Sequence, residues 1–350
     1  MNQLNKYDLG VTRHTKVVGS IYPDAKKHIG GVLATNGKIY FTPYNAEHIL
    51  ELNTATLTTT LVGSTYVGSQ KWAGGVLAPN GKIYFAPYEA SQILEFDPST
   101  LSTNLVGSVY SGSVKYVGGV LAPNGKIYFS PLTASQILEF DPSTLSTNLV
   151  GSVYVLSLKY YGCVLAPNNY IYFVPLNASQ VLRLDPTTGT TTLIGSSYGT
   201  GQKWAGGVLA PNGKIYCAPV DSTQILVIDT ATDTTTTVGS FTSTSLKYSG
   251  GVLTIEGSIL FIQRSSNRAY LFNPTTNKGR VIYNGYQGGN KYSGAALGTN
   301  GKIYCSPVDS TQILEIDKMN INNILGSDAV IPSDLSTLPT SNYNRYYNKF

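Results

Sequence analysis

A repeat of fixed length is the feature that most constrains this sequence. A glycine followed by a second small residue recurs along the chain, and each copy begins 44 residues after the previous one, with no insertion in any interval. The seven pairs are Gly30-Gly31, Gly74-Gly75, Gly118-Gly119, Gly162-Cys163, Gly206-Gly207, Gly250-Gly251 and Gly294-Ala295. Uniform spacing means that every unit has the same structure and the same contacts with its neighbours, so the chain must fold as an array of seven equivalent units.

Each unit has the pattern of four short strands. In the second unit, apolar and β-branched residues predict strands over residues 72–78, 82–86, 92–96 and 104–107. The sequence Pro-Asn-Gly at residues 79–81 predicts a tight turn, because proline suits its second position and glycine accepts a positive φ. Four strands in about 44 residues is the spacing of a propeller blade.

We therefore expect an all-β fold, a seven-bladed β-propeller with four antiparallel strands per blade. The first strand of each blade is innermost in this fold, and the glycine pair lets seven backbones converge on one axis. An open β-solenoid is the alternative. Solenoid coils usually have shorter repeats and need capping units, whereas a closed ring of seven units needs none.

The sequence also indicates how the ring closes. The fourth strand ends in Leu-Val-Gly-Ser, and similar segments precede the first complete unit at residues 17–20 and follow the last at residues 324–327. Only the N-terminal copy keeps the 44-residue register, so we expect it to complete the last blade. The propeller then spans residues 15–327, with an N-terminal extension over residues 1–14 and a C-terminal tail over residues 328–350.

Composition argues against several classes of protein. Charged residues make up 12% of the chain, about half of the usual ~25%, while 42% of residues are hydrophobic, enough for a packed core. The net charge of +5 is spread along the chain, which argues against nucleic-acid binding. The sequence shows neither a long apolar run nor a secretory signal, so we expect a cytoplasmic or virion-associated protein without membrane insertion. Three cysteines without a CxxC motif predict no disulfide framework.

The second and third strands resemble those of a known repeat family. The fifth unit reads Lys-Ile-Tyr-Cys-Ala-Pro at residues 214–219 and Ile-Leu-Val-Ile-Asp-Thr-Ala-Thr at residues 225–232. These segments resemble YVTN-type propeller repeats, and the glycine pair resembles that of kelch repeats. The resemblance covers residues 15–327 and implies the fold. It does not define a function, because such propellers serve as surface proteins, scaffolds, lectins and enzymes.

The repeat further predicts rings of side chains around one mouth of the central channel. A lysine occupies one position in every unit: Lys27, Lys71, Lys115, Lys159, Lys203, Lys247 and Lys291. The next position holds an aromatic residue or histidine: His28, Trp72, Tyr116, Tyr160, Trp204, Tyr248 and Tyr292. The loop between the second and third strands opens on the same face and supplies His48, Gln92, Gln136, Gln180, Gln224, Arg268 and Gln312.

Two interpretations of these rings stay open. As a binding face, aromatic platforms beside amide and ammonium donors suit a glycan or an anionic ligand. As architecture, the aromatic residues wedge between blades, and each lysine stem covers a ring while its ammonium group reaches water. Every copy keeps the lysine beside an aromatic residue or histidine, which architecture explains at least as well as binding does.

Catalytic and metal-binding signals are weak. The sequence has no HExxH, GxSxG or phosphate-binding glycine motif. Aspartates recur at the start of the turn after the third strand, where this residue usually bonds its own backbone: Asp97, Asp141, Asp185, Asp229 and Asp317. Cys163, Cys217 and Cys305 occupy positions of small or buried side chains, so we expect them to be buried. We expect no catalytic residue, metal or cofactor.

The sixth unit departs most from the repeat. Its residues 256–260, Glu-Gly-Ser-Ile-Leu, replace the usual Asn-Gly-Lys-Ile-Tyr pattern, and Arg264 and Arg268 appear in the following loop. Sequence drift and a basic partner site are the two explanations.

We interpret the chain as a non-catalytic binding or scaffold propeller. Enzymes usually break the symmetry of such a ring with long loops or a clustered acid, base or metal site, and here every interval is equal. Low charge and few cysteines fit a subunit of a larger assembly with protein partners, such as a structural or host-recognition component of a viral or phage particle. A lectin-like propeller with repeated glycan sites is the alternative, and a propeller lyase or hydrolase is the third possibility.

Overall fold

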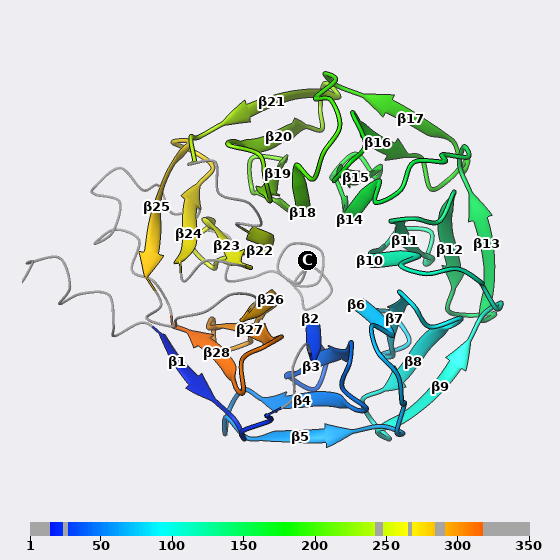
Figure 1. Cartoon of the computed structure of the whole chain (residues 1–350), viewed down its shortest axis with the longest axis vertical. Coiled ribbons are helices and arrows are strands. Elements are labelled where there is room, and N and C mark those ends of the chain that lie inside the picture. Colours follow the sequence, from blue (N-terminus) through cyan, green and yellow to red (C-terminus); the bar gives the residue numbers. More distant parts are fainter. Residues whose placement is uncertain (1–14, 24–26, 242–247, 265–267, 284–290, 318–350) are drawn as a thin grey trace, which may run out of the picture.

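A computed structural model describes residues 15–23, 27–241, 248–264, 268–283 and 291–317. Seven four-stranded antiparallel sheets radiate from a common axis (Figure 1), which confirms the predicted seven-bladed β-propeller. The described residues include no helix of the length and apolarity needed to cross a membrane. Strand order within each blade follows the chain, from the axis to the rim, except in the blade that joins the two ends.

The strand bounds repeat from blade to blade. The innermost strands are β2 (His28–Leu33), β6 (Trp72–Leu77), β10 (Tyr116–Leu121), β14 (Tyr160–Leu165), β18 (Trp204–Leu209), β22 (Tyr248–Leu253) and β26 (Tyr292–Leu297). The second strands are β3 (Lys38–Pro43), β7 (Ile83–Pro87), β11 (Ile127–Pro131), β15 (Ile171–Pro175), β19 (Lys214–Pro219), β23 (Ile259–Gln263) and β27 (Ile303–Pro307).

The two outer positions follow the same rule. The third strands are β4 (Ile49–Asn53), β8 (Ile93–Asp97), β12 (Ile137–Asp141), β16 (Val181–Leu184), β20 (Ile225–Asp229), β24 (Arg268–Asn273) and β28 (Ile313–Ile316). The outermost strands are β5 (Thr59–Val62), β9 (Ser102–Val106), β13 (Ser146–Val150), β17 (Thr191–Ile194), β21 (Thr234–Val238), β25 (Lys278–Tyr283) and β1 (Thr15–Val18). Blades 1 to 6 begin at β2, β6, β10, β14, β18 and β22, and blade 7 contains β26, β27, β28 and β1.

The N-terminal strand closes the ring, as the register of the repeat predicted. Strand β1 pairs antiparallel with β28, from Thr15 opposite Ile316 to Val18 opposite Ile313. Val18 is buried, so the closing strand contributes to the core as well as to the sheet. The C-terminal copy of the signature, at residues 324–327, lies outside the described residues.

The glycine pair has a more specific cause than convergence on an axis. The first glycine has a positive φ in every blade, for example +62° at Gly118, where the pairing of β10 with β11 shifts register. A side chain there would be strained, because L-residues rarely adopt this conformation. In blades 1, 2, 3 and 6 the second glycine lies against a phenylalanine ring, and a Cβ on Gly119 would lie 2.7 Å from Cδ1 of Phe129. Close approach of two inner strands occurs where Gly294 meets the backbone of Gly30.

The core consists of side chains that interlock between adjacent blades. The second strands of blades 1 to 4 each contribute a buried aromatic pair such as Tyr84 and Phe85, and those of blades 5 to 7 contribute one buried aromatic residue at these positions. Tyr84 of blade 2 packs on Phe140 of blade 3 with ring centroids 4.8 Å apart, and Tyr40 packs on Phe96 in the same way. Each of these aromatic side chains buries about 150–250 Å² of surface, and this burial is the main contribution to the packing between blades.

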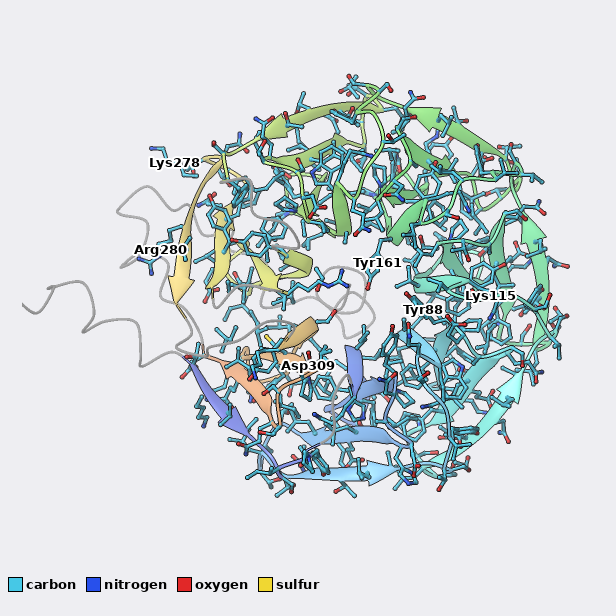
Figure 2. All side chains as sticks on the ribbon, viewed as in Figure 1. Tyr88, Lys115, Tyr161, Lys278, Arg280 and Asp309 are labelled. Atoms are coloured by element: carbon cyan, nitrogen blue, oxygen red, sulfur yellow. The ribbon has the colours of Figure 1, made fainter. Side chains whose placement is uncertain are left out.

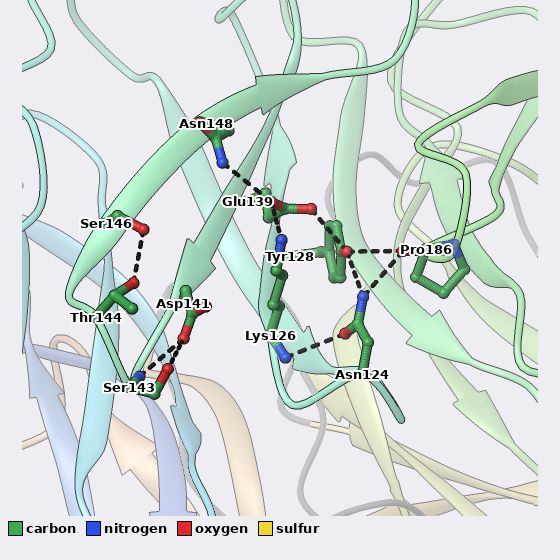
Figure 3. Close-up of polar contacts among 10 residues, drawn as sticks. All are labelled: Asn124, Lys126, Tyr128, Glu139, Asp141, Ser143, Thr144, Ser146, Asn148 and Pro186. Atoms are coloured by element: carbon green, nitrogen blue, oxygen red, sulfur yellow. Dashed lines mark hydrogen bonds and ion pairs between the residues drawn. The ribbon is translucent and has the colours of Figure 1, made fainter.

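A polar network lies at the ends of the strands opposite to the loops between second and third strands (Figure 3). In blade 3 the Asn124 amide donates to the Tyr128 hydroxyl at 2.9 Å, and that hydroxyl donates to Glu139 Oε2 at 2.8 Å. Lys126 Nζ donates to Glu139 Oε1 at 2.7 Å. The Asn124 amide also reaches the backbone oxygen of Pro186 in blade 4, so the network links neighbouring blades. The same lysine–glutamate pair recurs in blades 1, 2 and 7.

Blade 4 replaces this network without losing its charge balance. Tyr170 stands where blade 3 has its lysine, and Arg183 stands where blade 3 has its glutamate. The carboxylate comes instead from Asp233 of blade 5, which pairs with Arg183 and accepts a hydrogen bond from Tyr172 at 2.7 Å. The Arg183 guanidinium also lies 4.4 Å above the Tyr170 ring. Two substitutions in one blade are thus compensated by one residue of the next blade.

Candidate functional site

Two sets of loops form one mouth of the channel: the loops that enter each innermost strand and the loops between second and third strands. The predicted lysines join these two sets. Lys115 Nζ donates to the backbone oxygens of Gly112 at 2.8 Å, in its own incoming loop, and of Tyr88 and Glu89 at 3.2 Å, in blade 2. Lys159 makes the same contacts one blade further on. The ammonium groups of Lys115 and Lys159 therefore link adjacent blades through charge-assisted hydrogen bonds.

The lysines are more deeply placed than a binding face requires. The five buried members of the ring are Lys27, Lys71, Lys115, Lys159 and Lys203. Lys291 is half-buried, and Lys247 lies outside the described residues. Burial lowers the pKa of Lys71, Lys159 and Lys203 to about 8. These contacts favour the architectural interpretation of the lysine ring.

The second predicted set of residues, one aromatic residue or histidine in each blade, also packs inside the wall of the channel. Its buried members are His28, Trp72, Tyr116, Tyr160, Trp204, Tyr248 and Tyr292. Trp72 Nε1 donates to the backbone oxygen of Gln92 at 2.9 Å, and Trp204 Nε1 donates to that of Gln224 at 2.8 Å. His28 Nε2 lies 3.1 Å from the backbone oxygen of His48, so histidine fills the same place in blade 1. These rings separate and orient the loops.

The glutamine side chains lie at the outer rim and not at the channel mouth. Each amide nitrogen donates to the backbone oxygen of the glycine that follows the outermost strand of its blade, as Gln92 does to Gly107 at 2.8 Å. The other members with this bond are Gln136, Gln180, Gln224 and Gln312. The backbone of Arg268 begins β24, but its side chain lies outside the described residues. The amides therefore anchor the ends of the outermost strands.

Two other repeat positions line the mouth, and they are the ones that vary. The first is the second residue of each innermost strand: Ile29, Ala73, Val117, Tyr161, Ala205, Ser249 and Ser293. The second is the residue after each second strand: Tyr44, Tyr88, Leu132, Leu176, Val220, Arg264 and Val308. The apolar members from blades 1, 2, 3, 4, 5 and 7 belong to one buried cluster, and Tyr88 and Tyr161 pack against it.

A pocket of about 140 Å³ lies among these residues. Its lining residues are Ile29, Tyr44, Ala73, Tyr88, Tyr161, Arg264, Tyr292, Ser293 and Val308. They come from blades 1, 2, 4, 6 and 7, so the pocket belongs to the ring as a whole. Figure 2 shows Tyr88 and Tyr161 near the axis. The sequence marks Arg264 as unusual but gives no such signal for the tyrosines of the pocket. These tyrosines stand out only when each repeat position is compared across all seven units.

The pocket has a defined polarity. Tyr44 and Tyr88 meet edge to face with centroids 5.5 Å apart, and the Tyr44 hydroxyl donates to Gln70 Oε1 at 2.8 Å. Burial raises the pKa of Tyr88 to about 12 and also raises the pKa of Tyr44 and Tyr161, while the positive charge of Arg264 acts in the opposite direction on all three. Near neutral pH Tyr44, Tyr88 and Tyr161 are therefore neutral phenols in a pocket that also contains the Arg264 cation.

The acids and thiols expected to be structural have structural contacts. Asp97 Oδ1 accepts hydrogen bonds from the backbone and hydroxyl of Ser99, as expected for a turn residue. Cys163, Cys217 and Cys305 are buried, and burial raises the pKa of the Cys217 and Cys305 thiols. Over the ranges that the structure describes, histidine, cysteine, aspartate and glutamate form no group of three suited to a metal ion.

Comparison with known proteins supports the fold and leaves the ligand open. A family described as a repeat of unknown function, DUF6923, matches residues 163–333. No curated protein matches the sequence. Virginiamycin B lyase from Staphylococcus aureus has a similar structure, with a TM-score of 0.74 and 12% identity over 87% of this chain and 99% of that chain. A streptogramin B lyase gives a TM-score of 0.68 and 17% identity over 87% of this chain and 97% of that chain.

A sensor domain is also similar. The extracellular domain of a putative one-component system from B. thetaiotaomicron gives a TM-score of 0.66 and 14% identity, over 89% of this chain and 42% of that chain. At these identities the similarity shows the propeller fold alone. The chemistry of the mouth must therefore be argued from its own residues.

Proposed function

We propose that this protein is a non-catalytic binding propeller that holds a small ligand at the mouth of its channel. One observation carries the proposal: the pocket lies where the sevenfold repeat is broken, with Tyr44, Tyr88, Tyr161 and Arg264 replacing aliphatic residues of other blades. Concave sites with an apolar lining and a few convergent polar groups are typical of ligand binding.

The ionisable groups of the pocket suit recognition better than proton transfer. A general acid or base works best when its pKa lies near the operating pH. Here burial moves the tyrosine pKa values upward, to about 12 for Tyr88, and an arginine remains charged. Tyr44, Tyr88 and Tyr161 of the pocket thus stay neutral near pH 7, which supports binding over catalysis at this pocket.

The proposal is tested by screening the full chain against a library of small anions, sugars and amino acids with ligand-observed NMR. A matched variant carries Tyr88→Leu and Tyr161→Val, the residues found at the equivalent positions of blade 3, so the fold is expected to persist. Loss of binding in this variant, with binding retained in Lys278→Gln on the outermost strand β25, supports the proposal. Hits that bind the double variant equally well, or no hit at all, contradict it.

A catalytic alternative is tested with the same preparation. A solved structure of virginiamycin B lyase, an inactive variant, contains quinupristin. We expect quinupristin to remain intact when it is incubated with this protein and followed by mass spectrometry. Its cleavage would overturn the non-catalytic proposal.

A second candidate role is attachment to a protein partner in a larger assembly, such as a viral or phage particle. It is favoured by apolar side chains that project from the loops between blades, with exposed fractions of 72% at Val109 and 95% at Val155. Replacing Val109 and Val155 by serine is expected to release the protein from its native assembly without changing ligand binding. Retention of this variant in the assembly would contradict a partner on this surface.

A further inference from the structure

We propose, resting on the function above, that the channel mouth recognises a small organic monocarboxylate with a compact, largely apolar body. The juxtaposition that carries this inference is one cation, Arg264, beside an unengaged phenol, Tyr161, in a pocket whose other walls are aromatic or aliphatic except for Ser293, whose hydroxyl is hydrogen-bonded to that of Ser249. The charge of the pocket, its hydrogen-bond donors and its size each support one property of the proposed ligand.

Charge selects the sign of the ligand. Arg264 is the only charged residue that lines the pocket, and it makes no ion pair or hydrogen bond with another residue in the described ranges. It is half-buried, so its guanidinium group has lost part of its hydration. A bound anion would replace the lost hydration of the guanidinium group. A carboxylate matches the planar fork of arginine through two parallel hydrogen bonds.

The phenols supply neutral donors around the same point. Tyr161 extends from blade 4 toward the axis, and its hydroxyl has no hydrogen-bond partner among the described residues. The Tyr44 hydroxyl is already engaged with Gln70, which fixes the ring against Tyr88. One cation and one free phenol provide for a single carboxylate group. A ligand with several anionic groups would find no second cation in the pocket lining.

The remaining walls define the body of the ligand. Ile29, Ala73 and Val308 are apolar, and the tyrosine rings of blades 1 and 2, packed edge to face, provide an aromatic wall. A cavity needs a volume of roughly 10–15 Å³ to hold one water molecule. The pocket volume of about 140 Å³ therefore accommodates on the order of ten non-hydrogen atoms. An aromatic or short aliphatic acid fits this space, whereas a polymer does not.

The test uses sodium benzoate and its uncharged isostere benzamide, titrated into the full chain by calorimetry or ligand-observed NMR. Benzoate is expected to bind, and benzamide at least tenfold more weakly. Arg264→Val, which installs the residue of the equivalent positions in blades 5 and 7, is expected to weaken benzoate binding at least tenfold. Lys278→Gln removes a cation from the same blade outside the pocket and is expected to leave benzoate affinity unchanged. Equal melting temperatures of the Arg264→Val and parent proteins confirm that the variant is folded.

Two results would overturn this inference: no benzoate binding at millimolar concentrations, or equal affinities for benzamide or in Arg264→Val. The proposed function has a separate outcome. If other small molecules bind and depend on Tyr88 and Tyr161, the channel mouth is a ligand site and only the carboxylate assignment fails. If no small molecule depends on these tyrosines, both proposals fail.

Discussion

Departures from the repeat are compensated by a neighbouring blade at one end of the propeller and not at the other. Figure 3 shows the polar network of blade 3; blade 4 lacks the lysine and the glutamate of this network, and Asp233 of blade 5 supplies a carboxylate to Arg183. At the mouth, Arg264 replaces an aliphatic residue, and no carboxylate among the described residues forms an ion pair with it. A compensated change preserves structure, whereas an uncompensated charge in a pocket is a cost that ligand binding can offset. Framework residues thus differ from the residues that we propose to bind a ligand in whether a neighbouring blade compensates for their change.

Removing the closing strand should have the largest effect on the framework. A chain that begins at residue 21 lacks β1 and exposes the edge of β28, so we expect a loss of more than about 5 kcal/mol in the free energy of unfolding. Urea unfolding followed by circular dichroism measures it. A chain that begins at residue 11 retains β1 and is the control. Equal stability of the two truncated chains would rule out this role for β1.

Gly118→Val should have the next largest effect. Overpacking costs ~1–3 kcal/mol and the left-handed conformation ~1–2 kcal/mol per residue, so we expect a total loss of roughly 2–5 kcal/mol. Gly81→Ala separates the two contributions, because Gly81 also has a positive φ but nothing lies within 4 Å of its added Cβ. Its loss should be limited to the conformational part. A Gly118→Val protein as stable as the parent would contradict the importance of the bulge.

The compensation in blade 4 predicts a reversal of sign. Asp233→Asn should cost about 1–2 kcal/mol, between the values for exposed and buried ion pairs, because it leaves Arg183 and Tyr172 without their carboxylate. In a protein that also carries Tyr170→Lys and Arg183→Glu, the lysine–glutamate pair of blade 3 is restored and Asp233 faces a second carboxylate. There Asp233→Asn should be neutral or stabilising. An equal cost in both backgrounds would show that the residues do not compensate one another.

Acid should affect one framework residue through its burial. His28 is buried, and desolvation lowers its pKa to about 3, below the ordinary 6.5. Between these values the unfolded chain binds the additional proton, so this contribution to stability is present above pH 6.5 and is lost as the pH falls toward 3. His28→Trp, with the residue of blades 2 and 5, should make unfolding less sensitive to pH in this window. An unchanged pH dependence would contradict the assignment.

The smallest change in stability is expected at the mouth. Arg264→Val and Tyr161→Val install residues that other blades already carry, so the free energy of unfolding should change by less than about 0.5 kcal/mol. Thermal and urea unfolding of each variant measure this change. A loss of several kcal/mol from either variant would place the mouth residues in the framework and remove the contrast with the polar network.

The sequence predicted the fold and its closure because both depend on spacing. Four strands per unit, the turn at residues 79–81 and the pairing of the N-terminal strand all follow from register, and Gly81 has the expected positive φ of 80°. The direction of a loop side chain does not follow from register. Lys115 reaches carbonyl oxygens of blade 2, which depends on how adjacent blades sit against each other. The tyrosines of the pocket are scattered among four units, so their assembly requires the closed ring.

Ring closure has a consequence for the time course of synthesis. Strand β1 leaves the ribosome first, yet its partner β28 follows almost 300 residues later, which at about 5–20 residues per second takes roughly 15–60 s. The sheets of blades 1 to 6 are each encoded by a contiguous segment and can form during translation, whereas the seventh must wait. In that interval β1 has an unpaired edge, and the β28 of another finished chain offers it the same register. High expression should therefore favour strand-exchanged dimers, and slower initiation of translation should favour monomers.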